Sequence, residues 1–213
     1  MRAMVIGATG ATGKDLVDSI LKDDRFSSII IFTRKKSPWQ HEKLTEHIID
    51  FEDINSYQNI VEGDVFFSCL GTTLKEAGGK EKQWKIDYDF QFQFAKIAKE
   101  KNIERYVLVS SAHASSESKI FYSRMKGQLE EDVKKLNFNQ TIIFNPPSLI
   151  RENSTRKIEK FGVMIVSFLN KIGIAKAFQP LHTKDLALAM INSVFQLSDG
   201  EYNIQPSEIR SFL

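Results

Sequence analysis

The sequence predicts an α/β fold in which a doubly wound parallel sheet is covered by helices on both faces. Short apolar runs alternate along the chain with segments whose apolar residues recur at helical spacing. Most of these runs are rich in Val, Ile and Phe and do not alternate in polarity, which is typical of strands buried on both faces. Such a parallel sheet binds its ligands at the carboxyl ends of the strands.

Seven apolar runs are candidate strands, and four segments are candidate helices. The strands are residues 3–6, 28–32, 47–51, 65–69, 106–109, 141–144 and 202–204. The helices are residues 14–22, 88–101 and 122–136, and a segment through residue 194 with Thr183 as its N-cap. Residues 151–174 interrupt this alternation and indicate an insertion. We therefore expect one domain, with a ligand-binding core over about residues 1–147 and a small substrate-side extension over residues 148–213.

The composition favours one soluble domain in a reducing compartment. The 213 residues are 42% hydrophobic, and no linker divides them. The net charge of +2, with both signs spread along the chain, excludes the concentrated basic face of a nucleic-acid-binding protein. The single cysteine, Cys69, excludes an internal disulfide and a metal cluster. With no secretory signal at the first residues, we expect a cytoplasmic protein without a metal.

No membrane association is expected from the apolar segments. The longest apolar stretch, residues 161–169, is far shorter than the roughly twenty residues of a membrane span. The basic and apolar residues 151–171 leave open a contact with an anionic membrane surface.

Three glycines spaced three apart follow the first candidate strand, in the run Gly-Ala-Thr-Gly-Ala-Thr-Gly. The first glycine allows a sharp exit from the strand, the second lets backbone approach a pyrophosphate, and the third lets the next helix pack closely. The helix N-terminus adds free N–H groups and partial positive charge. This strand, turn and helix predict a Rossmann-type dinucleotide site. Its phosphate cradle is predicted to comprise Gly7, Thr9, Gly10, Ala11, Thr12 and Gly13.

The residues after the second strand bear on the choice of cofactor. An NAD-selective protein places an acidic residue there, whereas this chain has Thr33, Arg34 and Lys35. Basic side chains favour the 2′-phosphate, so we expect NADP, with NAD as the less favoured cofactor. The alternative is a solvated basic loop.

The ends of the third and fourth candidate strands complete the expected adenosine site. Asp50 is placed to accept from the adenine amino group, and the Phe51 ring to pack beside it; alternatively, Asp50 caps the next turn. Gly71 would let backbone run under the ribose. Its neighbours Leu70, Thr72 and Thr73 are included in the predicted site, unless they form an ordinary turn.

The sharpest chemical motif is Tyr122-x-x-x-Lys126, preceded by Ser110 and Ser111 at the end of the fifth strand. Residues four apart lie on one helix face, and a neighbouring ammonium favours the phenolate form of a tyrosine. Tyr122 can then exchange a proton with a substrate oxygen, while Lys126 holds the nicotinamide ribose. A serine hydroxyl can orient the same oxygen.

Together these motifs resemble the short-chain dehydrogenase/reductase family, in its atypical NAD(P)-binding branch. The glycine run, residues 68–73 and residues 122–130 are similar to small oxidoreductase-like relatives of the human Tat-interacting protein. The resemblance implies an NADP(H)-binding Rossmann fold with Tyr122 as general acid or base and Lys126 as its electrostatic partner and ribose anchor. It implies Ser111, with Ser110 second, as the residue that orients the substrate.

Two positions depart from the family pattern. The asparagine that many members carry in the helix after the fourth strand is not evident, and residues 86–88 read Ile-Asp-Tyr instead. Where the family often has Arg-Pro-Gly after the sixth strand, this chain has Asn145-Pro146-Pro147. A nicotinamide contact is then expected through the backbone at Pro146.

The favoured function is an NADP(H)-dependent oxidoreductase that transfers hydride to or from a small carbonyl or alcohol substrate. One alternative is a non-catalytic NADP(H)-binding redox sensor that contacts a partner protein. A nucleotide-sugar epimerase or dehydratase ranks lower, because the 66 residues after Pro147 are few for a nucleotide-sugar lobe. We expect a monomer or a homodimer.

Overall fold

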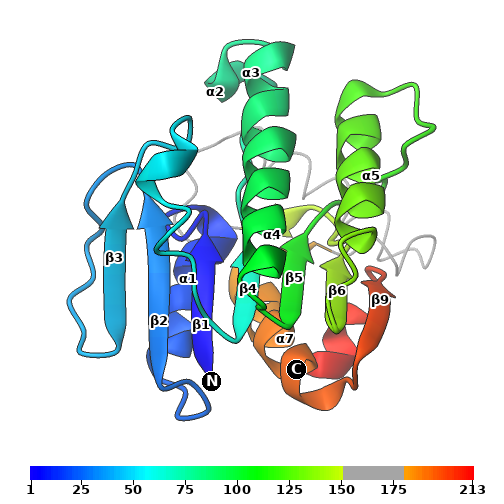
Figure 1. Cartoon of the computed structure of the whole chain (residues 1–213). Coiled ribbons are helices and arrows are strands. Elements are labelled where there is room, and N and C mark those ends of the chain that lie inside the picture. The colour runs from blue at the N-terminus through cyan, green and yellow to red at the C-terminus, as the bar shows by residue number, and fades with distance from the viewer. Residues whose placement is uncertain (151–179) are drawn as a thin grey trace.

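Seven strands form one parallel sheet in the order β3-β2-β1-β4-β5-β6-β9 (Figure 1). The computed structural model describes residues 1–150 and 180–213. The strands are β1 (Arg2–Ile6), β2 (Ser28–Thr33), β3 (Leu44–Ile48), β4 (Val65–Ser68), β5 (Arg105–Val109), β6 (Gln140–Phe144) and β9 (Gly200–Ile204). The chain runs outward from β1 through β2 to β3 and then returns to β4 on the other side of β1. This reversal creates a crevice at the carboxyl ends of β1 and β4, where such sheets bind ligands.

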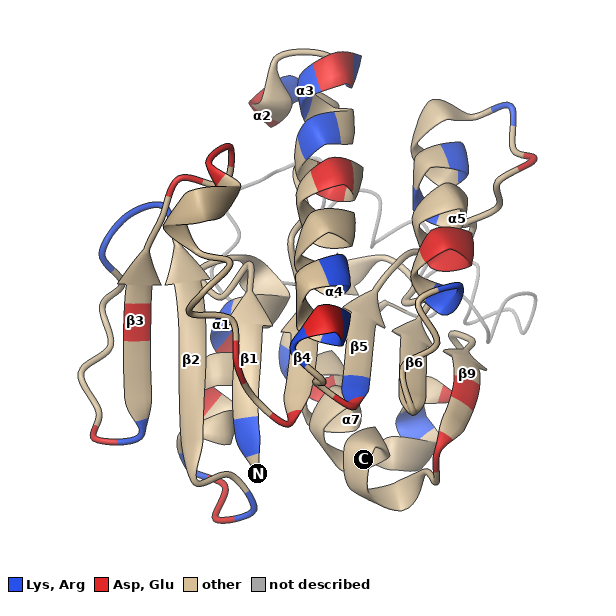
Figure 2. Ribbon diagram, in the orientation of Figure 1, with Lys and Arg blue, Asp and Glu red and all other residues tan. Residues whose placement is uncertain are grey.

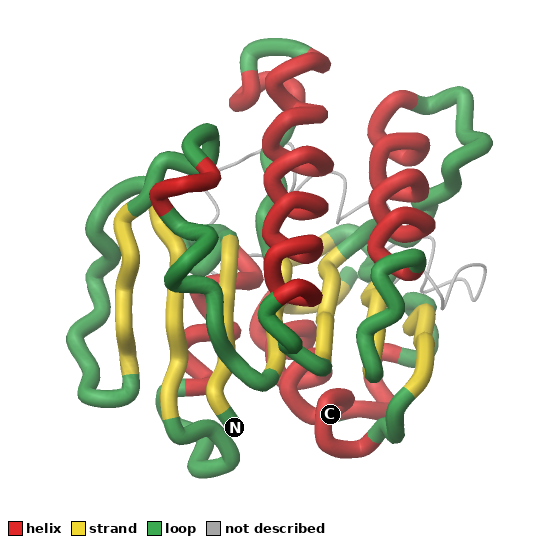
Figure 3. Tube along the Cα trace, viewed as in Figure 1, coloured by secondary structure: helices red, strands yellow, loops and turns green. Residues whose placement is uncertain are grey.

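Helices cover both faces of the sheet, so the fold has three layers: helices, sheet and helices (Figure 3). The helices α1 (Ala11–Ile20) and α7 (Thr183–Gln196) pack together on one face, and α4 (Phe90–Glu100) and α5 (Phe121–Lys134) lie on the other. Adjacent strand residues serve different cores: Val5 packs in the core of α1 and α7, and Met4 in that of α4. The doubly wound single-domain fold is therefore confirmed.

Short elements complete the structure above the carboxyl edge and after β6. They are η1 (Ile54–Ser56), α2 (Leu74–Ala77), α3 (Lys80–Trp84), a π-helical turn η2 (Lys85–Asp89), β7 (Leu149–Ile150), β8 (Leu181–His182) and η4 (Ile209–Phe212). In Figure 1, α2 and α3 lie beyond the carboxyl ends of the strands. Strands β7 and β8 pair in parallel as a separate two-stranded sheet. The predicted insertion at residues 151–174 lies outside the described residues.

Most element boundaries differ from the sequence-based expectation by a few residues, and two of these differences concern predicted residues. The third strand was expected at residues 47–51 but is Leu44–Ile48, because its register is set by pairing with β2, where Leu44 faces Ile29 and Ile48 faces Thr33. Asp50 and Phe51 therefore lie in the turn beyond the strand. Thr183 is the first residue of α7 rather than its N-cap, which is His182.

Charges of both signs are interspersed over the helices and loops in the view of Figure 2. In the described part of the chain, no helix has the length and apolar character needed to cross a membrane.

Candidate cofactor and active site

The glycine turn after β1 is shaped by close backbone packing. Gly7 has a φ of +75°, and a Cβ there would lie 2.4 Å from the carbonyl carbon of Cys69. A Cβ on Gly13 would lie 2.1 Å from the carbonyl oxygen of Gly7. The turn itself is closed by the N–H of Gly10, which donates to the Gly7 carbonyl at 2.9 Å. Glycine is thus required at positions 7 and 13 for α1 to start directly against the ends of β1 and β4.

The N-terminus of α1 is open to a ligand. Its N-cap is Gly10, no side chain caps it, and its first turn contains no acidic residue. The first N–H groups of a helix have no intrahelical partner and carry partial positive charge. They lie beside a cavity lined by Thr9, Gly10, Ala11 and Thr12. These features fit a pyrophosphate, so the cradle predicted from the glycine run is suited to its ligand.

Two adjoining cavities run along the carboxyl edge of the sheet. The larger has a volume of about 810 Å³, and its lining includes the glycine turn, residues 69–74, Ser110, Tyr122 and Lys126. The smaller, of about 380 Å³, is lined by Arg34, Phe51, Leu70, Gly71, Thr72, Glu76, Ile86 and Phe90. Leu70, Gly71, Thr72 and Glu76 line both. The two cavities therefore adjoin at the loop after β4, and their linings together extend from Arg34 after β2 to Tyr122 and Lys126 of α5.

The smaller cavity has the character of an adenosine site, but it uses only part of the predicted set. Phe51 is buried against Phe90, with ring centroids 5.5 Å apart, and Arg34 lines the opening. Lys35 is exposed and is not part of the lining. The carboxylate of Asp50 accepts from the N–H of Glu52 at 2.9 Å, which is the turn-capping alternative.

A carboxylate that the sequence analysis missed holds the basic loop. Glu46 of β3 accepts at one oxygen from the Thr33 hydroxyl at 3.0 Å and from the N–H of Ser37 at 2.8 Å. Thr33 is buried, and its hydroxyl is used in this hydrogen bond to Glu46. Only the pairing of β2 with β3 brings Glu46 to this loop, and Glu46 lies just before the strand that the sequence predicted at residues 47–51, so no local signal marked it.

The loop after β4 is fixed from both sides. Thr73 caps α2 in a capping box, since its hydroxyl accepts from the N–H of Glu76 and the Glu76 carboxylate accepts from the N–H of Thr73. The N–H of Thr72 donates to the carboxylate of Asp87 at 2.8 Å. The segment shared by both cavities is thus held in place without a ligand.

Asp87 is the buried group that anchors this loop. It is fully buried in the π-helical turn, where its carbonyl accepts from the Gln91 amide at 2.6 Å. Gln91 in turn accepts from the hydroxyl of Ser68, the last residue of β4. Burial raises the pKa of Asp87, while the charge of Lys126 and the Thr72 N–H lower it by less. A buried carboxylate therefore occupies the region where the expected asparagine is missing.

Tyr122 and Lys126 are brought together with the phosphate cradle. They lie one turn apart on α5, and both line the larger cavity. Lys126 is only 2% exposed, and among the described residues its ammonium has no hydrogen bond or ion pair. The charge of Lys126 lowers the pKa of Asp87 and of Glu130, so both carboxylates lie within its electrostatic reach. A buried cation facing a cavity in this way is available to ligand hydroxyls.

The two serines after β5 have different surroundings. Ser110 lines the larger cavity, but its hydroxyl donates to the buried carboxylate of Glu130. Ser111 is not part of that lining, and its carbonyl accepts from the Asn145 amide at 3.0 Å. The same amide donates to Glu130 at 2.7 Å. Burial raises the pKa of Glu130, and the bonds from Ser110 and Asn145 lower it by less.

Pro146 and Cys69 lie at the margins of the site. Pro146 is buried, and its carbonyl accepts from the N–H of Ala112 at 3.1 Å, which ties the loops after β5 and β6 together. Cys69 lines the larger cavity, where burial raises the pKa of its thiol to about 12. A raised pKa favours the protonated thiol, which is a weaker nucleophile than the thiolate. The described residues include no cluster of His, Cys, Asp and Glu suited to a metal ion.

The sheet, the glycine turn and the paired cavities define a dinucleotide-binding domain of the Rossmann type. The chain belongs to the NAD(P)H-binding family, whose sequence model matches residues 7–161.

Curated relatives include fungal proteins named "Protein FMP52, mitochondrial". The relative from Saccharomyces cerevisiae is 35% identical over 184 residues, which cover 85% of this chain and 80% of that protein. The relative from Eremothecium gossypii is 34% identical over 182 residues, with the same two shares.

Solved structures share the fold at low sequence identity. UDP-glucose 4-epimerase from Thermotoga maritima, solved with UDP-glucose, matches with a TM-score of 0.72 and 12% identity over 99% of this chain and 81% of its own. A short-chain dehydrogenase/reductase superfamily protein from Agrobacterium tumefaciens, solved with bound NAD, matches with a TM-score of 0.71 and 13% identity over 99% of this chain and 80% of its own. At such identities the likeness establishes the fold alone.

The expectation of a cytoplasmic protein is wrong. Curated relatives at 34–38% identity are named mitochondrial proteins. A single unpaired cysteine indicates a reducing environment, but it does not distinguish one such compartment from another.

Proposed function

We propose that the protein is an NADP(H)-dependent oxidoreductase of the short-chain type that acts on a carbonyl or alcohol substrate. The observation that carries this proposal is that Tyr122 and the buried Lys126 open into the same cavity as the uncapped N-terminus of α1. A phosphate cradle and a proton-transfer group are thereby joined in one space of about 810 Å³. The bound cofactor supplies or accepts the hydride.

The chain's own residues have separate tasks in this reaction. In reduction, the Tyr122 hydroxyl gives its proton to the substrate oxygen, and in oxidation its phenolate takes that proton back. The Lys126 ammonium donates to the ribose hydroxyls of the cofactor. Ser111 is proposed to orient the substrate oxygen on the basis of the family resemblance alone, since Ser111 is not part of the cavity lining and the Ser110 hydroxyl, which is, donates to Glu130.

NADP is the proposed cofactor rather than NAD. Arg34 at the opening of the smaller cavity supports this preference, since a guanidinium pairs well with a 2′-phosphate. Fluorescence titration with NADPH and NADH tests it. We expect NADPH to bind at least tenfold more tightly, and an Arg34→Ala variant to lose most of the difference; equal affinities in the native protein would contradict the preference.

Substitution of Tyr122 tests the reaction itself. With a carbonyl compound that the native protein reduces, Tyr122→Phe should lower kcat at least a hundredfold and leave the dissociation constant of NADPH nearly unchanged. Full NADPH oxidation by this variant would exclude Tyr122 as the acid. A Tyr202→Phe variant, which removes a hydroxyl that contacts Ser198 and is not part of the cavity lining, serves as the control.

The similarity to small relatives of the Tat-interacting protein remains a prediction from the sequence.

The names of the curated relatives support a mitochondrial location for this protein. Cell fractionation of the untagged full-length protein with an antibody would test the location. Recovery outside mitochondria would contradict it.

A further inference from the structure

Exposed apolar side chains gather at the mouth of the larger cavity. Seven large hydrophobic residues are exposed in the described part of the chain, and three of them line this cavity: Leu74, Ile120 and Tyr122, at 48%, 68% and 38% exposure. They come from separate segments, namely α2, the loop before α5, and α5 itself. Convergence of exposed apolar groups from distant segments on one cavity marks a binding surface for an apolar group.

The neighbouring lining has the same character. Phe121, Val109 and Leu149 extend the apolar surface between the exposed residues and the catalytic helix face. The ammonium of Lys80 lies 5.6 Å from the centroid of the Phe121 ring, so this cation rests on an aromatic face. The carboxylate of Glu76 is engaged in the capping box of α2. The charged groups at the mouth are thus already engaged within the protein.

The sugar of a sugar nucleotide would be poorly matched to this apolar mouth. Each sugar hydroxyl that leaves water without gaining a hydrogen bond costs binding free energy, whereas a hydrocarbon group gains it. The rest of the lining is more polar and includes the Lys126 ammonium, Thr9 and Thr12 of the glycine turn, and Thr72 and Thr73 after β4. Tyr122 belongs to both parts, because its ring is exposed at the mouth and its hydroxyl is polar. A ligand with one polar end and an apolar body fits this division.

We infer that the substrate of this site is a lipophilic carbonyl compound or the matching alcohol, with its oxygen at Tyr122 and its hydrocarbon body along Leu74, Ile120 and Phe121. This inference rests on the proposed oxidoreductase function and names its substrate class.

A series of straight-chain aldehydes tests the inference by rate. NADPH oxidation by the full-length protein is measured with butanal, hexanal and decanal. Each methylene that leaves water should improve kcat/KM by about threefold, because burial of a methylene is worth about that factor, until the hydrocarbon fills the mouth. Rates independent of chain length, or highest for butanal, would overturn the inference.

Binding without turnover separates the two proposals. Butanol, hexanol, decanol and UDP-glucose are tested for displacement of the apolar dye 1-anilinonaphthalene-8-sulfonate. Displacement should strengthen with chain length, and UDP-glucose should have no effect; displacement by UDP-glucose alone would overturn the inference. If the alcohols bind by length but no aldehyde is reduced, the oxidoreductase proposal fails and the apolar site stands. If only short aldehydes are reduced, the oxidoreductase proposal stands and the inference of a lipophilic substrate fails.

Matched serine variants locate the effect. Ile120→Ser and Leu74→Ser should each raise the KM for decanal about fivefold to tenfold and change that for butanal less than twofold. Ile48→Ser and Leu188→Ser are the controls, because these residues have similar exposure, at 59% and 40%, and are not part of the cavity lining. These two variants should change neither the KM for decanal nor the KM for butanal. An equal effect of all four variants would exclude the mouth as the site of recognition.

Discussion

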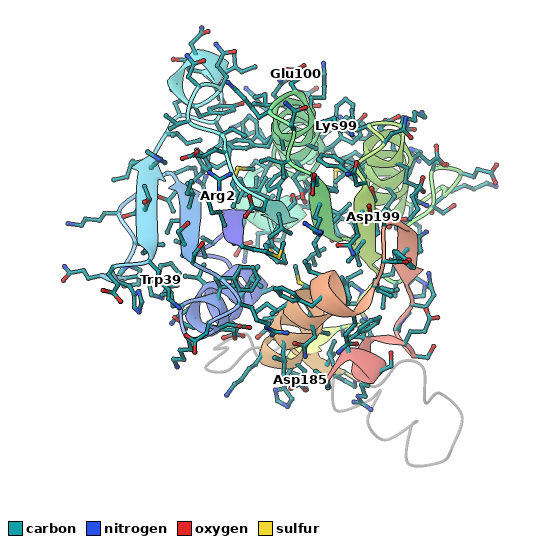
Figure 4. The ribbon with its side chains drawn as sticks, turned by 60° about the horizontal axis from the view of Figure 1, so that its bottom comes forward. Arg2, Trp39, Lys99, Glu100, Asp185 and Asp199 are labelled. Carbon is teal, nitrogen blue, oxygen red and sulfur yellow. The ribbon has the colours of Figure 1, made fainter. Side chains whose placement is uncertain are left out.

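Two aspartates at opposite ends of the sheet make the same backbone contact in different surroundings. At the amino end, Asp64 accepts from the N–H of Arg2 at 2.7 Å, and at the carboxyl end, Asp87 accepts from the N–H of Thr72 at 2.8 Å. The Asp64 side chain is 38% exposed and pairs with the Arg2 guanidinium, whereas Asp87 is fully buried. Figure 4 is turned toward the amino end of the sheet and labels Arg2 there.

The pKa values of these aspartates shift in opposite directions. Partial burial raises the pKa of Asp64, but the hydrogen bonds from Arg2 lower it by more, so the net shift is downward. Burial of Asp87 outweighs the charge of Lys126 and the Thr72 bond, so its pKa rises. At the amino end, the charges of Arg2 and Asp64 pair in contact with solvent, and such exposed pairs stabilise the fold only modestly. The carboxyl end keeps Asp87, Lys126 and Glu130 buried, with Lys126 in the lining of the larger cavity, and burial of these charged groups costs stability.

The largest effect should come from the backbone cradle at the carboxyl end. Gly13→Ala would place a Cβ 2.1 Å from the Gly7 carbonyl, so the turn and the start of α1 must separate. We expect at least a hundredfold weaker NADPH binding in a fluorescence titration and a loss of about 3 kcal/mol in unfolding free energy.

The control for Gly13→Ala is Ser19→Ala in the same helix. The Ser19 hydroxyl only donates to the carbonyl of Asp15, so this change should affect binding by less than a factor of two. Retained NADPH affinity in Gly13→Ala would show that the close packing at this turn is dispensable.

The two aspartates should differ next in the cost of removal. Asp87→Ala leaves the Thr72 N–H without its buried acceptor, and we expect about 2 kcal/mol less unfolding free energy and roughly tenfold weaker NADPH binding. Asp64→Ala exposes the corresponding N–H of Arg2 to water and should leave cofactor binding unchanged. Urea unfolding and fluorescence titration measure both. Equal costs at both ends would contradict the comparison.

The pH dependence of stability should have opposite signs for these residues. Because the pKa of Asp87 is raised, the stabilisation that this residue gives to the folded state is complete below the ordinary pKa of 3.8. This stabilisation is lost as the pH rises through the raised pKa. Because the pKa of Asp64 is lowered, the stabilisation that Asp64 gives to the folded state is present above pH 3.8. This stabilisation is lost as the pH falls through the lowered pKa.

Asparagine variants isolate these contributions in urea unfolding. Relative to the native protein, Asp87→Asn should gain stability as pH rises above about 4. Asp64→Asn should instead lose stability, relative to the native protein, as pH rises toward 4. Parallel pH profiles for the two variants would refute the assignment of opposite shifts.

Local patterns predicted the glycine turn and the placement of Tyr122 and Lys126 on one helix face, and long-range contacts explain what was missed. The glycine turn and Tyr122-x-x-x-Lys126 are each defined by neighbours within a few residues, so their spacing could be recognised in the sequence. Asp87 acts on Thr72 only because the π-helical turn brings it back under the loop after β4.

The third strand and the serines illustrate the same limit. The run of residues 47–51 is apolar enough for a strand, yet pairing with β2 ends the strand at Ile48. Ser110 and Ser111 are adjacent in sequence, and only the packing of Glu130 from α5 distinguishes their hydroxyls. Such partners follow from tertiary structure and have no fixed spacing along the chain.

The smallest effect should come from the amino-terminal ion pairs. Arg2 pairs with Glu62 and Asp64, each at 3.2 Å, with side chains 47%, 63% and 38% exposed. Exposed pairs contribute about 0–1 kcal/mol and are screened by salt, so Arg2→Ala should lower the unfolding free energy by less than about 1 kcal/mol. The difference from the native protein should shrink in urea unfolding at high salt. A larger loss that persists in salt would mean that charges at this end are as tightly coupled to the fold as those around Lys126, and the two ends would no longer differ in kind.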